Sequence, residues 1–255
     1  MSGRCRLIAL HGFLGRASDW DQVAQWFPDS PISAIDIWSM LSSPDVIDWP
    51  SVGRAVDRAV TDAAGDVEQG AACLVAYSFG ARLALSSHLL ASPESPVRGC
   101  CFVSCNPGLA EDDAAARDAR READETWARR LLEGREADIW REWDAQPVFN
   151  GSRRLTARGD LPATRTVLAG AMRRFSLAGQ PDFRPKLRAW RSPMLWLTGA
   201  YDTKFSALAR GLLTAGVQAQ FAVCDAAGHR VPWDNPSGFA EQVRAWTGRV
   251  MEISR

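Results

Sequence analysis

Apolar runs of strand length alternate with helical segments along most of this chain, and this alternation limits the possible fold more than any other feature. Six runs of this kind are predicted strands, at residues 6–10, 32–37, 72–77, 97–107, 193–202 and 219–229. Strands that are apolar throughout are buried on both faces, and strands joined through helices run parallel. The sequence therefore predicts an α/β fold with a mostly parallel central sheet and helices on both faces.

The strand pattern stops near residue 109 and returns near residue 186. The intervening segment is charged, rich in alanine and helical in its spacing. A chain of 255 residues is long enough for one large α/β domain that carries an insertion. We expect residues 1–108 and 186–255 to form the core and residues 109–185 to form a helical cap.

Charge and composition exclude several classes of partner. The chain has 30 basic and 30 acidic residues, without the basic excess typical of nucleic-acid binding. No apolar run approaches the roughly 20 residues that span a bilayer, and the first residues lack the pattern of a signal peptide. The six cysteines show no zinc-binding spacing. We expect a cytoplasmic protein without a metal, a nucleic-acid partner or a membrane span.

The stretch VAYSFGAR, residues 75–82, places Ser78 between a predicted strand and a predicted helix. A sharp strand-to-helix turn can present a serine as a nucleophile when small residues flank it, and Ala76 and Gly80 are small. The glycine usual at the first of these two positions is replaced by Ala76. The alternative is that Ser78 only caps the following helix.

A reactive hydroxyl needs a base, and the chain has three histidines. His229 follows a late predicted strand and precedes the last helix, a placement that suits a general base. His88 is predicted to lie within the helix after Ser78 and to be structural. His11 follows the first strand, where we expect it to shape a loop whose N–H groups face an anion.

Three aspartates compete to orient His229. Asp202 ends a predicted strand, Asp225 lies on the strand before His229, and Asp234 lies at the entrance of the last helix. The order Ser78, Asp202, His229 is the order that α/β-hydrolases use, and it favours Asp202.

Several stretches together resemble the α/β-hydrolase fold family and, within it, the 2-succinyl-6-hydroxy-2,4-cyclohexadiene-1-carboxylate synthases of menaquinone biosynthesis. These stretches are LHGFLGRASDW, YSFGARLAL, NPGL, ARREADETWARRL, EWDAQPVF, LAGQPD, GAYDTKF and AGH. The chain departs from the family pattern at Ala76 and Ala81, where glycines are usual, and at Asp144, where a tyrosine follows the tryptophan in the family.

The resemblance implies a carbon–oxygen lyase that needs no cofactor. Its substrate would be 2-succinyl-5-enolpyruvyl-6-hydroxy-3-cyclohexene-1-carboxylate, a small molecule with three carboxylates, and pyruvate would leave. Ser78, activated by His229 and Asp202, would remove a ring proton. The backbone N–H groups of Phe13 and Phe79 would form the oxyanion hole.

The resemblance also implies which residues bind the substrate. Arg82 lies one helical turn after Ser78, and a guanidinium can hold a carboxylate through two hydrogen bonds. Tyr77, Arg120, Trp143 and Arg158 complete the implied set, with Arg121 as an alternative to Arg120; Lys204 and Phe205 match the family without an implied role.

Two other functions remain open at this stage. A carboxylesterase or carbon–carbon bond hydrolase would use the same three residues and form an acyl-enzyme. A binding protein that has kept the fold but lost its activity would be expected to lack one of the three, and none is missing. The sequence does not determine the oligomeric state.

Overall fold

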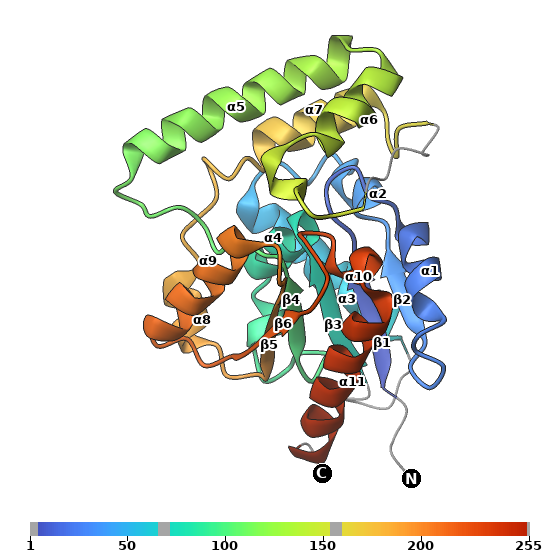
Figure 1. Ribbon diagram of the computed structural model, residues 1–255. Helices are drawn as coiled ribbons and strands as arrows, with labels where there is room; N and C mark the ends of the chain where they lie inside the picture. The colour runs from blue at the N-terminus through green and yellow to red at the C-terminus, as the bar shows by residue number, and fades with distance from the viewer. Residues whose placement is uncertain (1–4, 66–71, 154–159, 254–255) are drawn as a thin grey trace.

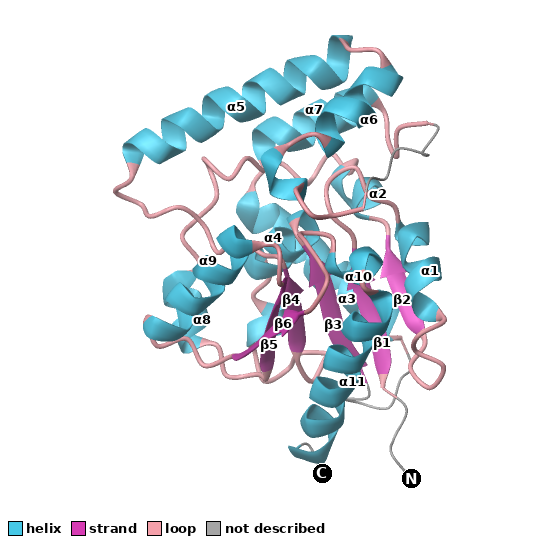
Figure 2. Ribbon diagram, in the orientation of Figure 1, coloured by secondary structure: helices cyan, strands magenta, loops and turns pink. Residues whose placement is uncertain are grey.

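A sheet of six parallel strands forms the centre of the computed structural model, which describes residues 5–65, 72–153 and 160–253 (Figures 1 and 2). In spatial order the strands are β2 (Ile32–Ile35), β1 (Arg6–Leu10), β3 (Ala72–Tyr77), β4 (Cys100–Val103), β5 (Met194–Gly199) and β6 (Gln220–Cys224). Every neighbouring pair is parallel, which confirms the predicted sheet. The helices that cross between the strands make this arrangement possible.

The four inner strands are buried on both faces, because their successive apolar side chains point to opposite sides of the sheet, whereas the edge strands β2 and β6 are mostly half-buried. On β3, Leu74 and Ala76 belong to one core cluster, whereas Cys73 and Val75 belong to the other. The first cluster is covered by α3 (Trp49–Ala64), α4 (Phe79–Ser86) and α8 (Arg184–Ala189), and the second by α1 (Asp21–Ala24) and α11 (Pro236–Ile253). The prediction of helices on both faces is therefore confirmed.

The remaining helical elements lie in the connections. They are η1 (Ala17–Trp20), α2 (Ile37–Leu41), η2 (Leu89–Ala91), α5 (Ala114–Glu133), α6 (Glu136–Asp144), η3 (Pro147–Phe149), α7 (Arg165–Arg174), α9 (Thr203–Thr214) and α10 (Val231–Asp234). Helices α5, α6 and α7, here called the cap helices, lie above the edge of the sheet at which the strands end (Figure 1). Ligands of open α/β sheets bind at this edge.

Five predicted elements end earlier than their patterns suggested, namely helix α4 and the strands predicted to end at residues 37, 107, 202 and 229, which end at Ile35, Val103, Gly199 and Cys224. The second strand stops at Ile35 because the Asp36 side chain accepts a hydrogen bond from the Trp38 N–H and caps α2. Helix α4 stops at Ser86, so His88 is not within a helix as predicted but lies exposed at the start of η2. The extended backbone of Ser87 ends the helix before His88.

The structure bears on membrane and metal binding within its described residues only. Among them, no helix combines the length and the apolar character needed to cross a bilayer. No group of three or more histidine, cysteine or acidic side chains is placed to hold a metal ion in that part of the chain.

Candidate active site

Ser78 lies on a strained turn between β3 and α4. Its φ of 51° and ψ of −109° place it in a region that non-glycine residues rarely adopt. The turn is tight because α4 packs on β1: a Cβ atom at Gly80 would lie 2.4 Å from the His11 carbonyl oxygen. Ala76 is completely buried within β3, so this position accommodates the extra methyl group.

A chain of hydrogen bonds joins Ser78, His229 and Asp202. The Ser78 Oγ lies 3.0 Å from the His229 Nε2, and the His229 Nδ1 lies 2.7 Å from the Asp202 Oδ2. An aspartate at Nδ1 keeps the proton on that nitrogen, which leaves Nε2 free to accept the serine proton. The imidazole and the carboxylate are both buried, so water competes little with these contacts. The arrangement is chemically competent for proton transfer through the serine.

Asp202 is held by the helix that follows it. Its Oδ1 accepts a hydrogen bond from the Phe205 N–H, 3.2 Å away, so the carboxylate caps α9 while its other oxygen faces His229. The N-terminal end of a helix favours a negative charge. Phe205 also packs its ring 4.5 Å from the imidazole centroid, which restricts the orientation of His229.

The two competing aspartates lie elsewhere. Asp225 is exposed in the turn after β6. The Asp234 carboxylate accepts hydrogen bonds from the Gly228 N–H at 2.9 Å and from the Arg153 N–H at 2.8 Å. Asp234 therefore stabilises the loop that carries His229 rather than contacting the imidazole in the hydrogen-bond chain.

A cavity of about 350 Å³ opens beside Ser78 and His229, beneath the cap helices. Phe13 and Phe79, the two predicted oxyanion-hole residues, line it. Within the described part of the chain, neither of their N–H groups donates to a backbone carbonyl. The cationic side chains of Arg82, Arg120 and Lys204 are among the described residues that line the cavity.

Arg82 lines the cavity but is already partly bound by the protein. Its Nε donates to the Gln180 Oε1 at 2.5 Å, and its Nη2 donates to the Phe175 carbonyl at 2.8 Å. Burial, together with the charge of Arg120, lowers the pKa of Arg82 to about 9, which leaves the guanidinium cationic near neutral pH. A bound anion would relieve both of these unfavourable effects.

The two alternative cap arginines occupy different environments. Arg120 lines the cavity and forms a two-bond ion pair with Asp124, at 2.7 and 2.9 Å. Arg121 pairs with Asp118 on an exposed helix face and does not appear among the cavity residues. The prediction for Arg158 lies outside the described residues.

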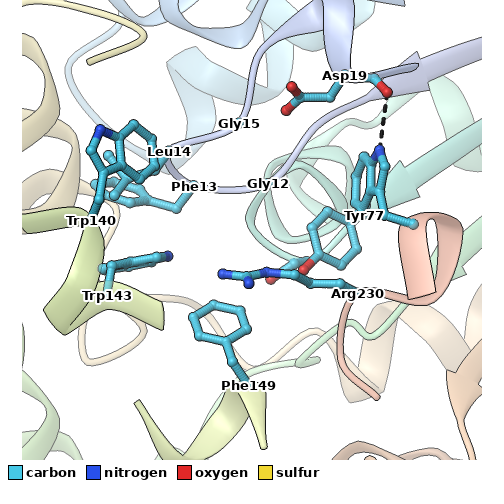
Figure 3. A pocket seen from close by; sticks show the side chains of 12 residues that line it. Gly12, Phe13, Leu14, Gly15, Asp19, Tyr77, Trp140, Trp143, Phe149 and Arg230 are labelled. Atoms are coloured by element: carbon cyan, nitrogen blue, oxygen red, sulfur yellow. Dashed lines mark hydrogen bonds between the residues drawn. The ribbon is translucent and has the colours of Figure 1, made fainter. Parts of the chain in front are cut away.

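Tyr77 and Trp143 line a second, smaller pocket of about 40 Å³ that also reaches Ser78 (Figure 3). Trp143 borders the larger cavity as well, as do Phe13, Ser78 and Phe149. The Tyr77 ring packs against Trp233, with centroids 4.9 Å apart. Burial raises the pKa of Tyr77, so its hydroxyl remains a hydrogen-bond donor over the physiological pH range.

Arg230 is a pocket residue that the sequence analysis did not select. Its guanidinium lies 3.9 Å from the centroid of Phe149, between the side chains of Trp143 and Tyr77 (Figure 3). Its Nη2 pairs with the Asp144 Oδ1 at 2.5 Å. Its position directly after His229 was the one sequence feature that could have marked Arg230 as a pocket residue. Its pairing with Asp144 depends on the fold and could not be predicted from that position.

Comparisons with known proteins identify the family of this chain. A family model described as "Alpha/beta hydrolase family" matches residues 7–242. The chain belongs to the alpha/beta hydrolase family.

Named relatives in the alpha/beta hydrolase family are similar over nearly the whole chain. The 2-succinyl-6-hydroxy-2,4-cyclohexadiene-1-carboxylate synthase of Klebsiella pneumoniae strain 342 is 34% identical, and the match covers 92% of this chain and 91% of that protein. The enzyme of the same name from Serratia proteamaculans is 32% identical, with 93% and 91% covered.

Two solved structures show the same fold as this chain. The structure of MenH from S. aureus has a TM-score of 0.80 at 21% identity and covers 98% of this chain and 96% of its own. A structure from a study of carboxylesterases of Nitrososphaera gargenis has a TM-score of 0.73 at 13% identity, with 99% and 93% covered.

Proposed function

We propose that this protein is a lyase that eliminates pyruvate from 2-succinyl-5-enolpyruvyl-6-hydroxy-3-cyclohexene-1-carboxylate to give 2-succinyl-6-hydroxy-2,4-cyclohexadiene-1-carboxylate. The observation that carries the proposal is the hydrogen-bonded chain of Ser78, His229 and Asp202 at a cavity that holds cationic side chains. The names of the relatives that are 32–34% identical support the same reaction.

In the proposed mechanism, the His229 Nε2 accepts the proton of the Ser78 hydroxyl as the serine oxygen removes a proton from the substrate ring. The bond between the ring carbon and the enolpyruvyl oxygen breaks. The proton held by the His229 imidazolium then passes to the released enolpyruvate, which becomes pyruvate, while Ser78 keeps the ring proton as its hydroxyl hydrogen. Asp202 stabilises the imidazolium that forms. The reaction is balanced without a redox step, so these groups suffice for it.

Negative charge develops on a substrate oxygen when the ring proton leaves. The N–H groups of Phe13 and Phe79 are the proposed donors to this oxygen, and a donor of this type contributes roughly 2.7–4 kcal/mol to the transition state in related sites. Arg82 and Arg120, with Tyr77 and Trp143, are proposed to hold the carboxylates and the ring under a cap formed by residues 109–185.

Pyruvate release from substrate generated in situ tests the reaction. A coupled lactate dehydrogenase assay should show a rate well above the spontaneous one for the wild-type protein. Ser78→Ala removes the proposed base, so its rate should fall by roughly 10²–10⁴-fold. Its thermal unfolding midpoint should stay near that of the wild type, because Ser78 forms no side-chain cap on α4.

The outcomes separate three possibilities. A wild-type rate equal to the spontaneous rate would reject the proposed elimination. Ester hydrolysis by the same residues would instead give a burst of nitrophenol from an activated ester and rapid capture of Ser78 by a phosphonate. A Ser78→Ala variant that loses stability but keeps its rate would show that the serine is structural.

A further inference from the structure

Ser104 carries a buried hydroxyl that has no hydrogen-bond partner in the part of the chain that the structure describes. The residue follows β4 and is fully buried, and its Oγ lacks a partner anywhere in the described residues. Its backbone is nevertheless firmly held, because its N–H donates to the Leu197 carbonyl at 2.9 Å. Buried polar groups are nearly always paired, so an unpaired hydroxyl requires an explanation.

Ser104 lies next to Ser78 at the edge of the sheet. Tyr77 and Val103 are paired across β3 and β4, and the two serines are the residues that follow them. The Ser78 N–H donates to the Val103 carbonyl at 2.9 Å, which fixes the two turns together. Both serines have a positive φ, 51° for Ser78 and 48° for Ser104. Both line the cavity of about 350 Å³.

The cavity distinguishes Ser104 from the other buried polar atoms that lack partners. Those atoms are the indole nitrogens of Trp20, Trp49, Trp190 and Trp196 and the Nη2 of Arg184, and none of their residues lines this cavity. Ser104 is therefore the member of this group that borders the cavity.

The cationic end of the cavity is tied to the segment that carries Ser104. The Gln180 side chain donates to the Asn106 carbonyl at 3.1 Å and accepts from the Arg82 Nε at 2.5 Å. Asn106 is two residues after Ser104 and lines the same cavity. This link places a fixed guanidinium and an unpaired hydroxyl around one space, a combination that suits an anionic oxygen.

We propose that Ser104 is a substrate-binding residue whose Oγ donates a hydrogen bond to a carboxylate or carbonyl oxygen of the bound substrate. The identity of that substrate rests on the proposed function, whereas the binding role of the hydroxyl does not. Without a ligand the hydroxyl is desolvated and unpaired. Replacing Ser104 by alanine should therefore not lower the stability of the protein.

Two variants test this role with opposite effects on the backbone. Ser104→Ala removes the hydroxyl at a residue that still disfavours a positive φ, whereas Ser104→Gly removes it and relaxes that φ. Both should raise the KM of the pyruvate-releasing reaction about tenfold or more. Both should also weaken binding of phthalate, a ring dicarboxylate, by a similar factor in calorimetry. Neither should lower the thermal unfolding midpoint.

Ser206→Ala is the matched control. The Ser206 hydroxyl is also buried, but it lies 2.8 Å from the Thr198 hydroxyl and is absent from the cavity lining. Its loss should lower the unfolding midpoint and leave the KM and the phthalate dissociation constant unchanged. This pattern is the reverse of the one expected for Ser104.

The results test the role of Ser104 and the proposed elimination reaction separately. Wild-type values of both KM and the phthalate dissociation constant in Ser104→Ala and Ser104→Gly would overturn the role of Ser104. A loss in only one of the two variants would also overturn it, because the backbone would then be the cause. A wild-type protein that binds phthalate but releases no pyruvate would refute the proposed elimination alone. The role of Ser104 would then be decided by comparing the phthalate dissociation constants of the wild type and the two variants. A wild-type protein that does neither would overturn both.

Discussion

Replacing Asp144 by leucine should destabilise the protein strongly, because it leaves the guanidinium of Arg230 buried without its carboxylate. The two side chains are 2% and 3% exposed and pair at 2.5 Å. Arg230 also donates to the Arg153 carbonyl at 2.7 Å, so it is held in place when the ion pair is broken. Removing one partner of a buried ion pair costs about 3–5 kcal/mol.

Urea unfolding of Asp144→Leu measures this loss directly as a decrease in the free energy of unfolding. For a chain of this size, each kcal/mol lowers the thermal midpoint by about 2–4 °C, so the midpoint should fall by roughly 6–20 °C. The double variant Asp144→Leu/Arg230→Met should recover most of the loss, since apolar side chains of similar volume often replace a buried ion pair without cost.

Asp118→Leu is the control for this experiment. Asp118 pairs with Arg121 on the exposed face of α5, where the two side chains are 74% and 62% exposed. Exposed pairs contribute about 0–1 kcal/mol, so this variant should stay close to the wild type. Equal losses in Asp144→Leu and Asp118→Leu, or a double variant no more stable than the single one, would refute the reasoning.

Three further changes test other parts of the structure. Arg82→Lys keeps the charge but loses the two-bond geometry, so kcat/KM should fall at least about tenfold; near-normal kinetics would exclude a carboxylate contact there. Gly80→Ala forces a methyl group against the His11 carbonyl and should cost about 1–3 kcal/mol in urea unfolding, and wild-type stability would contradict the tight packing of the turn. Burial lowers the pKa of Lys186 to about 8. Between pH 8 and 10.5 the unfolded chain thus binds more protons at Lys186, and the wild type should gain stability relative to Lys186→Met as the pH rises; a constant difference would count against this explanation.

Local pattern was sufficient to predict most of the sheet. Continuous apolar runs identified all six strands, and the inner four are buried on both faces, which requires a strand to be apolar along its whole length. The ends of the elements were predicted less well, because single side chains decide them. The cap formed by Asp36 ended β2, and the extended backbone at Ser87 ended α4 before His88.

The chain order also indicated which side chains to expect at the end of the sheet. Ser78, Asp202 and His229 each lie at or directly after the end of a predicted strand, and parallel strands bring such positions to one edge. The structure places the Ser78 hydroxyl and the Asp202 carboxylate each within hydrogen-bonding distance of His229, although Ser78 and His229 are 151 positions apart. Their catalytic roles stay predictions that the experiments above test.

Tertiary packing alone decided the remaining features of the site. The pairing of Arg230 with Asp144 joins residues 86 positions apart, and no local pattern marks either as a partner of the other. The unpaired hydroxyl of Ser104 is equally invisible in the sequence, because being unpaired depends on every neighbour that surrounds it. Periodicity determines which residues are buried, whereas the identity of the neighbours of a buried polar group depends on how distant segments pack together.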